Sequence, residues 1–123
     1  MLRKLTPMLE TPDLAETISF YTEVLGFSCN NRSDEMGWAH LSKDEAEIMF
    51  SLPNAHRNIP QPIMSGSLYL YTDQVEALWD NLKDRCAICY PLETFEYGMR
   101  EFAVFDNNGY LLQFGQDITD QPE

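Results

Sequence analysis

The chain has 123 residues, and eight Lys and Arg against twenty Asp and Glu give it a formal net charge of -12. A field of this sign repels phosphate backbones and anionic lipids, so we expect neither nucleic acid nor a membrane as a partner. The same field concentrates cations and favours a positively charged small-molecule ligand, although the acidic excess can equally serve solubility alone. The length suits one domain that needs no disulfide or structural metal for its core.

The N-terminal residues and the cysteines indicate where in the cell the protein is expected. The start MLRKLTPMLE lacks the apolar stretch of a secretory signal. No run of 18 apolar residues follows, so we expect a cytoplasmic protein. The three cysteines are an odd number, which argues against a disulfide framework. Cys86 and Cys89 have the spacing of a redox pair but follow a predicted helix instead of starting one, so chance explains this motif.

Two stretches have the apolar periodicity of amphipathic helices. The first places its apolar residues on one face, at Leu14, Ile18, Tyr21 and Leu25. The second does so at Val75, Leu78, Trp79 and Leu82. Capping boxes that begin at Asp13 and Asp73 predict where the helices start, and Gly26 predicts the end of the first. The two boxes lie 60 residues apart, which indicates a repeat.

Each predicted helix has one predicted strand before it and three after it. The strands of the first module are expected at 3–9, 27–32, 38–42 and 47–52, and those of the second at 66–72, 88–92, 101–106 and 110–115. The sequence Asn107-Asn108-Gly109 predicts the tight turn of the last hairpin. The pattern indicates an α+β domain of two tandem βαβββ modules, at about 1–52 and 66–116. A linker at about 53–65 joins them, and a polar tail at 117–123 follows.

Motifs in both modules resemble those of a known family. Residues 12–14 (PDL), 20–21 (FY) and 25–27 (LGF) resemble the opening signature of the vicinal-oxygen-chelate superfamily. This superfamily includes glyoxalases, bleomycin-resistance proteins and extradiol dioxygenases. Residues 97–102 (YGMREF) and 105–110 (FDNNGY) resemble its closing signature. The resemblance implies curved mixed sheets around a cavity with the helices outside, and a homodimer in which modules pair within or between chains.

Alternation along the strands divides the side chains between two sheet faces. The uniformly apolar set, expected beneath the helices, includes Ile48, Phe50, Leu68, Leu70, Ala103, Phe105, Leu112 and Phe114. The opposite set mixes rings with polar groups, as an organic-ligand pocket does, although a solvated face with ordinary aromatics is the alternative. It supplies the ligand-binding candidates Trp38, Phe102, Tyr69, Tyr71, Met49, Thr6, Ser67 and Gln113. Trp38 and Phe102, at similar places in the repeat, are expected to flank a flat ligand, with Trp38 as its main anchor.

The resemblance also locates the ligands of the metal-dependent members, and here the sequence departs from the family. Carried over by motif position, those sites fall on Thr6, Met49, Ser67 and Gln113, of which only Gln113 is a plausible donor. We therefore expect no metal and no cofactor. His40 and Glu47 also belong to the inward set, and we interpret them as a hydrogen-bonded structural pair.

The leading hypothesis is a homodimeric, metal-independent protein similar to the bleomycin-resistance branch. It would sequester a small aromatic compound, with a cation favoured, and so serve antibiotic resistance. One alternative is a glyoxalase- or dioxygenase-related lyase or transferase that uses His40 or Glu47 as a general base. Another is an interaction protein whose pocket is filled by its own side chains.

Overall fold

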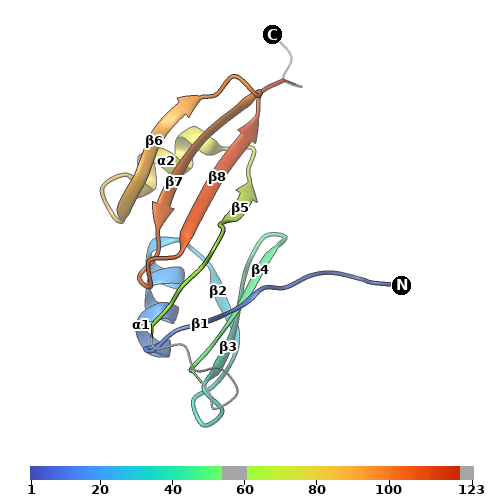
Figure 1. The fold of residues 1–123 in the computed structure, drawn as a ribbon, viewed down its shortest axis with the longest axis vertical. Helices are drawn as coiled ribbons and strands as arrows, with labels where there is room; N and C mark the ends of the chain where they lie inside the picture. The colour runs from blue at the N-terminus through green and yellow to red at the C-terminus, as the bar shows by residue number, and fades with distance from the viewer. Residues whose placement is uncertain (54–60, 120–123) are drawn as a thin grey trace. The chain divides into compact units, whose positions relative to one another are not determined.

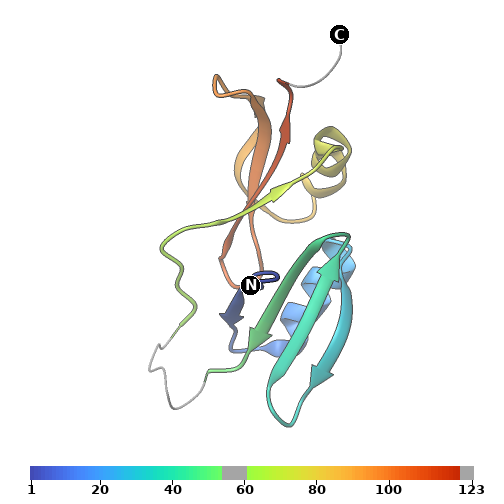
Figure 2. The same cartoon turned by 90° about the vertical axis from the view of Figure 1, so that its right-hand side faces the viewer.

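The structure is a computed structural model that describes residues 1–53 and 61–119. It divides into two compact units, Met1–Ile63 (unit 1) and Met64–Glu123 (unit 2). Each unit has a four-stranded mixed sheet with a helix on one face (Figures 1 and 2). This is the α+β fold of two repeated modules that the sequence predicts. Among the described residues, no helix is long and apolar enough to span a membrane.

Unit 1 follows the β-α-β-β-β order. Its elements are β1 (Met8–Glu10), α1 (Leu14–Ser19), a π-helical turn η1 (Phe20–Val24), β2 (Ser28–Ser33), β3 (Trp38–Lys43) and β4 (Ala46–Ser51). The strand order is β1-β4-β3-β2, with β1 parallel to β4 and the other neighbours antiparallel. In Figure 2 this sheet lies in front of α1.

Local signals set the ends of the first helix. The side chain of Asp13 accepts a hydrogen bond from the Glu16 amide at 3.0 Å, so the Asp13 half of the predicted capping box is confirmed. The amide of Asp13 donates to Oγ1 of Thr11 at 3.2 Å instead of to the Glu16 side chain. Gly26 has a φ of +81°, a backbone conformation that favours glycine and ends the helical segment. Tyr21, on the buried face of this segment, places its ring 4.9 Å from that of Phe50 on β4.

The first strand is shorter than predicted. We expected it at 3–9, but it begins at Met8, and Met1 to Leu5 form an exposed extended segment. Pro7 explains the difference, because proline has no amide proton to donate to a ladder. Its carbonyl still accepts a hydrogen bond from the Met49 amide at 2.9 Å.

Unit 2 repeats the topology of unit 1. Its elements are β5 (Leu68–Tyr71), α2 (Val75–Leu82), β6 (Ala87–Thr94), β7 (Met99–Phe105) and β8 (Leu111–Asp117). The strand order is β5-β8-β7-β6, again with the first strand parallel to the last. Helix α2 lies behind the sheet in Figure 1. The predicted linker and tail fall partly on residues 54–60 and 120–123, which lie outside the described residues.

The second helix is not capped as predicted. Its N-cap is Gln74, whose side chain makes no capping hydrogen bond, so the expected capping box at Asp73 is wrong. The amide of Val75 instead donates to Oε1 of Gln116, on the neighbouring strand β8, at 3.1 Å. Gln116, 41 residues away in the sequence, thus accepts the hydrogen bond from the start of the helix that Asp73 was expected to accept.

Strand β7 presents the opposite faces from those predicted. Its ladder pairs Phe102 with Phe114, and cross-strand partners project to the same face of a sheet. The ring of Phe102 is fully buried and lies 5.2 Å from the ring of Trp79 on α2. The expectation that Phe102 faces a ligand is therefore wrong, because it belongs to the core beneath the helix. Ala103 and Phe105, expected beneath the helix, belong to the open face.

Candidate functional site

The open face of the unit 2 sheet holds a buried carboxylate surrounded by tyrosines. Glu101, on β7, has 1% of its surface exposed. Its Oε1 accepts hydrogen bonds from the hydroxyls of Tyr69 at 2.9 Å and Tyr97 at 2.8 Å, and its Oε2 accepts one from the hydroxyl of Tyr90. Burial of an unpaired carboxylate is very costly, so these three donors are what allows Glu101 to lie inside the protein.

Three separate elements bring the tyrosines to this carboxylate. Tyr69 comes from β5 and Tyr90 from β6, while Tyr97 lies in the turn between β6 and β7. That turn closes with a hydrogen bond from the Phe95 amide to the Met99 carbonyl at 2.8 Å. Gly98 completes it with a φ of +88°, a conformation that is strained for other residues.

A chain of hydrogen bonds extends the site across the sheet. The Nε2 of Gln113, on β8, donates to the hydroxyl oxygen of Tyr90 at 2.9 Å. The hydroxyl of Ser67 in turn donates to Oε1 of Gln113 at 2.5 Å. In this series of hydrogen bonds, each donor is directed toward Glu101. We call the surface formed by Ser67, Tyr69, Tyr71, Tyr90, Phe95, Tyr97, Glu101 and Gln113 the tyrosine face.

The environment keeps these phenols protonated. Desolvation, followed by the hydrogen bond to Glu101, raises the pKa of Tyr90 from 10.0 to about 12. The same two causes raise the pKa of Tyr69 and Tyr97 above the ordinary tyrosine value. All three hydroxyls therefore remain hydrogen-bond donors to Glu101 at neutral pH.

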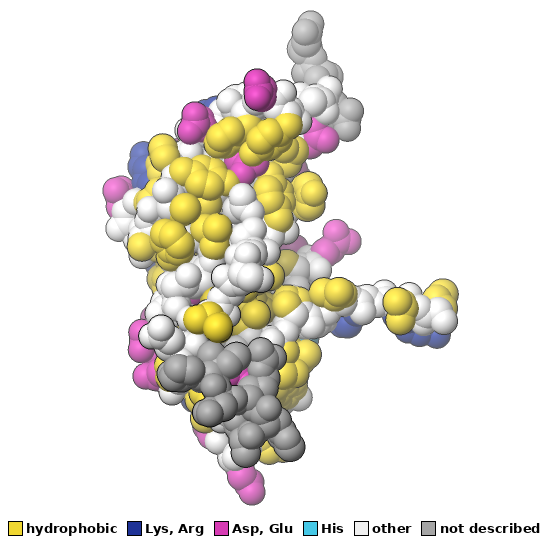
Figure 3. Space-filling model, viewed as in Figure 1, with side chains coloured by type: hydrophobic (Ala, Val, Ile, Leu, Met, Phe, Trp, Pro, Cys, Tyr) yellow, Lys and Arg dark blue, Asp and Glu magenta, His cyan; other side chains and the backbone are white. Residues whose placement is uncertain are grey.

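Aromatic rings cover the tyrosine face. The rings of Phe95 and Tyr97 stack at a centroid distance of 5.4 Å, and the ring of Tyr71 lies 5.0 Å from that of Tyr69. Tyr71 is 79% exposed and Tyr97 is 63% exposed. Figure 3 shows hydrophobic side chains, tyrosine included, gathered over the strands of unit 2. Exposed aromatic patches of this kind are typical of binding surfaces.

Gly115 on β8 makes room for Tyr69. A Cβ atom at this position would lie 2.0 Å from the Tyr69 hydroxyl oxygen and 2.7 Å from the Cζ atom of its ring. These distances are far below van der Waals contact, so any larger residue would displace the ring. Gly115 therefore allows Tyr69 to lie across β8 and reach Glu101.

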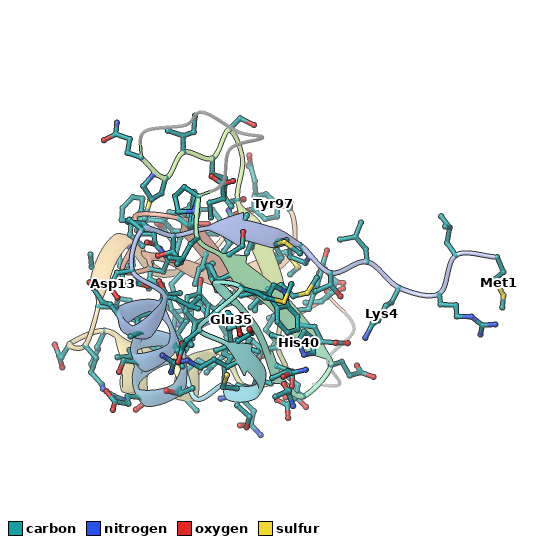
Figure 4. The ribbon with its side chains drawn as sticks, turned by 90° about the horizontal axis from the view of Figure 1, so that it is seen from below. Met1, Lys4, Asp13, Glu35, His40 and Tyr97 are labelled. Carbon is teal, nitrogen blue, oxygen red and sulfur yellow. The ribbon has the colours of Figure 1, made fainter. Side chains whose placement is uncertain are left out.

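The open face of unit 1 carries the other predicted residues. Nε1 of Trp38 donates to the sulfur of Met49 at 3.3 Å. Nε2 of His40 lies 2.8 Å from Oε1 of Glu47, and Nζ of Lys4 bonds both oxygens of Glu47 at 2.8 and 2.9 Å. Figure 4 labels Lys4 and His40. Lys4 first, and His40 second, hold the pKa of Glu47 below its usual value, which makes this carboxylate a weak base and supports a structural pair.

The four positions that the resemblance assigns to metal ligands do not fit a divalent ion. Thr6 and Ser67 supply hydroxyls and Met49 a thioether, which are poor donors for such ions. The amide oxygen of Gln113 already accepts the Ser67 hydroxyl. Within residues 1–53 and 61–119, no three His, Cys, Asp or Glu side chains form a group that could hold a metal.

The predicted ligand-binding residues belong to two different units. Tyr69, Tyr71, Ser67 and Gln113 come together on the tyrosine face, whereas Trp38 and Met49 contact each other in unit 1. Thr6 precedes β1 and is half-buried. The predicted set omits Glu101, Tyr90, Phe95 and Tyr97, which complete the site. The turn at 107–109 sets the register of the last hairpin and therefore the faces of β7, so it could have placed Glu101 on the open face, although not beside its tyrosine partners.

Comparisons with known proteins agree with this architecture. The model of the Glyoxalase/Bleomycin resistance protein/Dioxygenase superfamily matches residues 6–114. A search of curated proteins finds no match.

Several solved structures share the fold. A protein of unknown function from Agrobacterium tumefaciens is 18% identical at a TM-score of 0.77, with 94% of each chain covered. TioX from Micromonospora sp. ML1 is 16% identical at a TM-score of 0.75, with 94% of this chain and 99% of that chain covered. A glyoxalase/bleomycin resistance protein/dioxygenase from Nocardioides is 15% identical at a TM-score of 0.76, with 98% and 87% covered. At these low sequence identities, the similarity to the three structures shows a shared fold and nothing about function. The match over residues 6–114, together with the repeated two-unit fold, shows that the chain belongs to the Glyoxalase/Bleomycin resistance protein/Dioxygenase superfamily.

Proposed function

We propose that this protein binds a small planar aromatic compound on the tyrosine face without the help of a metal. The observation that carries the proposal is the pair of exposed rings, Tyr71 and Tyr97, beside the buried carboxylate of Glu101. Each well-placed ring pair contributes about 0.5–1.5 kcal/mol beyond simple burial. A role in resistance to such a compound, in the cytoplasm and as a homodimer, completes the proposal.

The hydrogen-bond network supports binding because it fixes the rings in advance. The hydroxyl of Tyr97 is held at 2.8 Å from Glu101, and its ring is stacked on Phe95. A side chain that is already ordered loses little conformational entropy when a ligand arrives. The net charge of -12 adds a long-range attraction for cationic compounds.

Trp38 no longer serves as the main anchor in this proposal. Its expected partner across the ligand, Phe102, is buried beneath α2 and cannot stack on a ligand. Trp38 itself lies in unit 1 with its indole nitrogen bonded to Met49. The rings of unit 2 therefore replace it as the stacking surface.

A binding screen with paired variants tests the proposal. Calorimetric titration of the full chain with flat bicyclic aromatic compounds, in cationic, neutral and anionic forms, should identify at least one ligand. Tyr97→Ala should then weaken binding by at least ~10-fold, the usual effect of truncating an anchoring ring. Trp38→Ala is the matched control and should leave affinity unchanged. The proposal fails if no compound binds, or if Trp38→Ala weakens binding and Tyr97→Ala does not.

A further inference from the structure

We infer that the tyrosine face selects aromatic ligands bearing a protonated nitrogen with N–H groups, such as an ammonium or amidinium. Glu101 would act as their counter-ion through the phenol oxygens. This inference deepens the proposed function and rests on it. The proposed function concerns the aromatic ring of the ligand. This inference concerns the charged group attached to that ring, which stacking on the ring does not select.

The first support is the direction of the hydrogen bonds. A tyrosine hydroxyl has one proton to donate and lone pairs to accept with. The protons of Tyr69, Tyr90 and Tyr97 are all directed to Glu101. Their oxygens can therefore only accept hydrogen bonds from a ligand. A ligand N–H finds a partner here, whereas at these three phenols a carbonyl or carboxylate oxygen meets only lone pairs.

The second support is that two of the three oxygens remain available. The oxygen of Tyr90 already accepts the amide N–H of Gln113 at 2.9 Å. Tyr69 and Tyr97 accept no hydrogen bond from another residue in the described part of the chain. Tyr97 is also exposed, so its oxygen can be reached from solvent.

The third support is an uncompensated negative charge. Three O–H donors converge on the two oxygens of Glu101, the pattern of an ionised carboxylate. Among the described residues, no Lys, Arg or His forms an ion pair with Glu101. A ligand cation bonded to the oxygen of Tyr97 would lie within about 6 Å of this carboxylate, close enough for opposite charges to interact strongly.

The raised pKa values of the phenols keep this pattern in place. Since Tyr69, Tyr90 and Tyr97 lose their protons less readily than ordinary tyrosines, none becomes an anion at neutral pH. The three phenols therefore stay neutral hydrogen-bond partners of Glu101.

Three probes with one ring system separate the recognition of the ring from that of the nitrogen. The probes are naphthylmethylammonium, its N-trimethylated form and naphthoate, each titrated calorimetrically into the full chain. We expect the primary ammonium to bind at least ~10-fold more tightly than the trimethylated cation, because a hydrogen bond to a charged group contributes at this level. Naphthoate should bind most weakly.

The outcomes distinguish the two proposals. If none of the probes binds, the proposed function and this inference both fail. If the two cations bind equally, or naphthoate binds best, the aromatic surface stands and the inference about N–H recognition is wrong.

Two hydroxyl deletions locate the acceptor. Tyr97→Phe keeps the ring and removes the oxygen, so it should reduce the preference for the primary over the trimethylated cation by ~10-fold. Tyr110→Phe is the matched control, since Tyr110 is buried and lies outside the tyrosine face, and it should keep the preference. Equal effects of the two deletions would overturn the assignment.

A glycine pair tests the site without altering any residue that contacts the ligand. Gly115→Ala should displace the Tyr69 hydroxyl, whose oxygen lies 2.0 Å from the new Cβ, and thereby reduce the same preference. Gly66→Ala places its Cβ in open space and should leave the preference intact. An unchanged preference in Gly115→Ala, with the fold verified by circular dichroism, would count against a role for the network.

Discussion

The faces of β7 can be tested by truncating two phenylalanines on that strand, with Phe102→Ala and Phe105→Ala. Phe102 is fully buried, and its ring centroid lies 5.2 Å from those of both Trp79 and Phe114. Phe105 is 36% exposed, on the opposite face. The same atoms are removed in both variants, so any difference in stability reports the environment of each ring.

The expected magnitudes differ clearly. Removal of a fully buried phenylalanine side chain costs about 3–5 kcal/mol of unfolding free energy, because contacts are lost and a cavity remains. A partly exposed ring loses less, about 1 kcal/mol. At a urea dependence of about 2 kcal/mol per molar, the two unfolding midpoints should differ by about 1–2 M, with Phe102→Ala lower.

The fluorescence of Trp79 provides the assay. The chain contains two tryptophans, so a Trp38→Phe background leaves Trp79 as the reporter of unit 2. Phe102→Leu keeps most of the volume and should give an intermediate midpoint if Phe102→Ala does not fold at all. The assignment of faces is refuted if Phe105→Ala destabilises unit 2 as much as Phe102→Ala or more. The alternation in the sequence predicted that Phe105, and not Phe102, is the buried ring.

Four further outcomes follow from the same contacts. Asp13→Ala should lower the unfolding free energy by about 0.5–2 kcal/mol and Asp73→Ala should change it little, as urea titrations would show, because only Asp13 caps a helix. Since the folded state raises the pKa of Tyr90 from 10.0 to about 12, unfolding free energy should fall as pH rises through this range, less so in Tyr90→Phe. Elemental analysis should find no stoichiometric divalent metal, and one tightly held ion per chain would contradict the interpretation of Thr6 and Met49. Sedimentation at micromolar concentration should show a dimer, and a monomer alone would contradict that expectation.

Repeated local patterns made most of the fold predictable. In the described part of the chain, both helices and the eight strands were expected near their observed positions, although β1 is shorter than predicted, because apolar periodicity and turn residues are local signals. The Asp13 cap was predictable for the same reason, since its partner Glu16 lies three residues away. The Asp73 cap failed because Gln116, far along the chain, supplies the hydrogen bond instead.

The error at Phe102 has a different cause. Alternation states that neighbours on a strand face opposite sides, but it does not state which side is buried. Ala103 and Phe105 on one face are as apolar as Phe102 and Val104 on the other, so either pair could be the buried one. Pairing of Phe102 with Phe114 decides the matter, and this pairing depends on the register of the hairpin.

Glu101 shows most clearly where local reasoning ends. Its three tyrosine partners lie 32, 11 and 4 residues away, so no single motif reports them. A buried carboxylate is also a poor way to stabilise a strand, because apolar residues of similar volume often replace buried charged groups without loss of stability. Core stability therefore gives no reason for an acid and three phenols at this position. Recognition of a ligand does give one, and sites that break local rules in this way are those where function is expected.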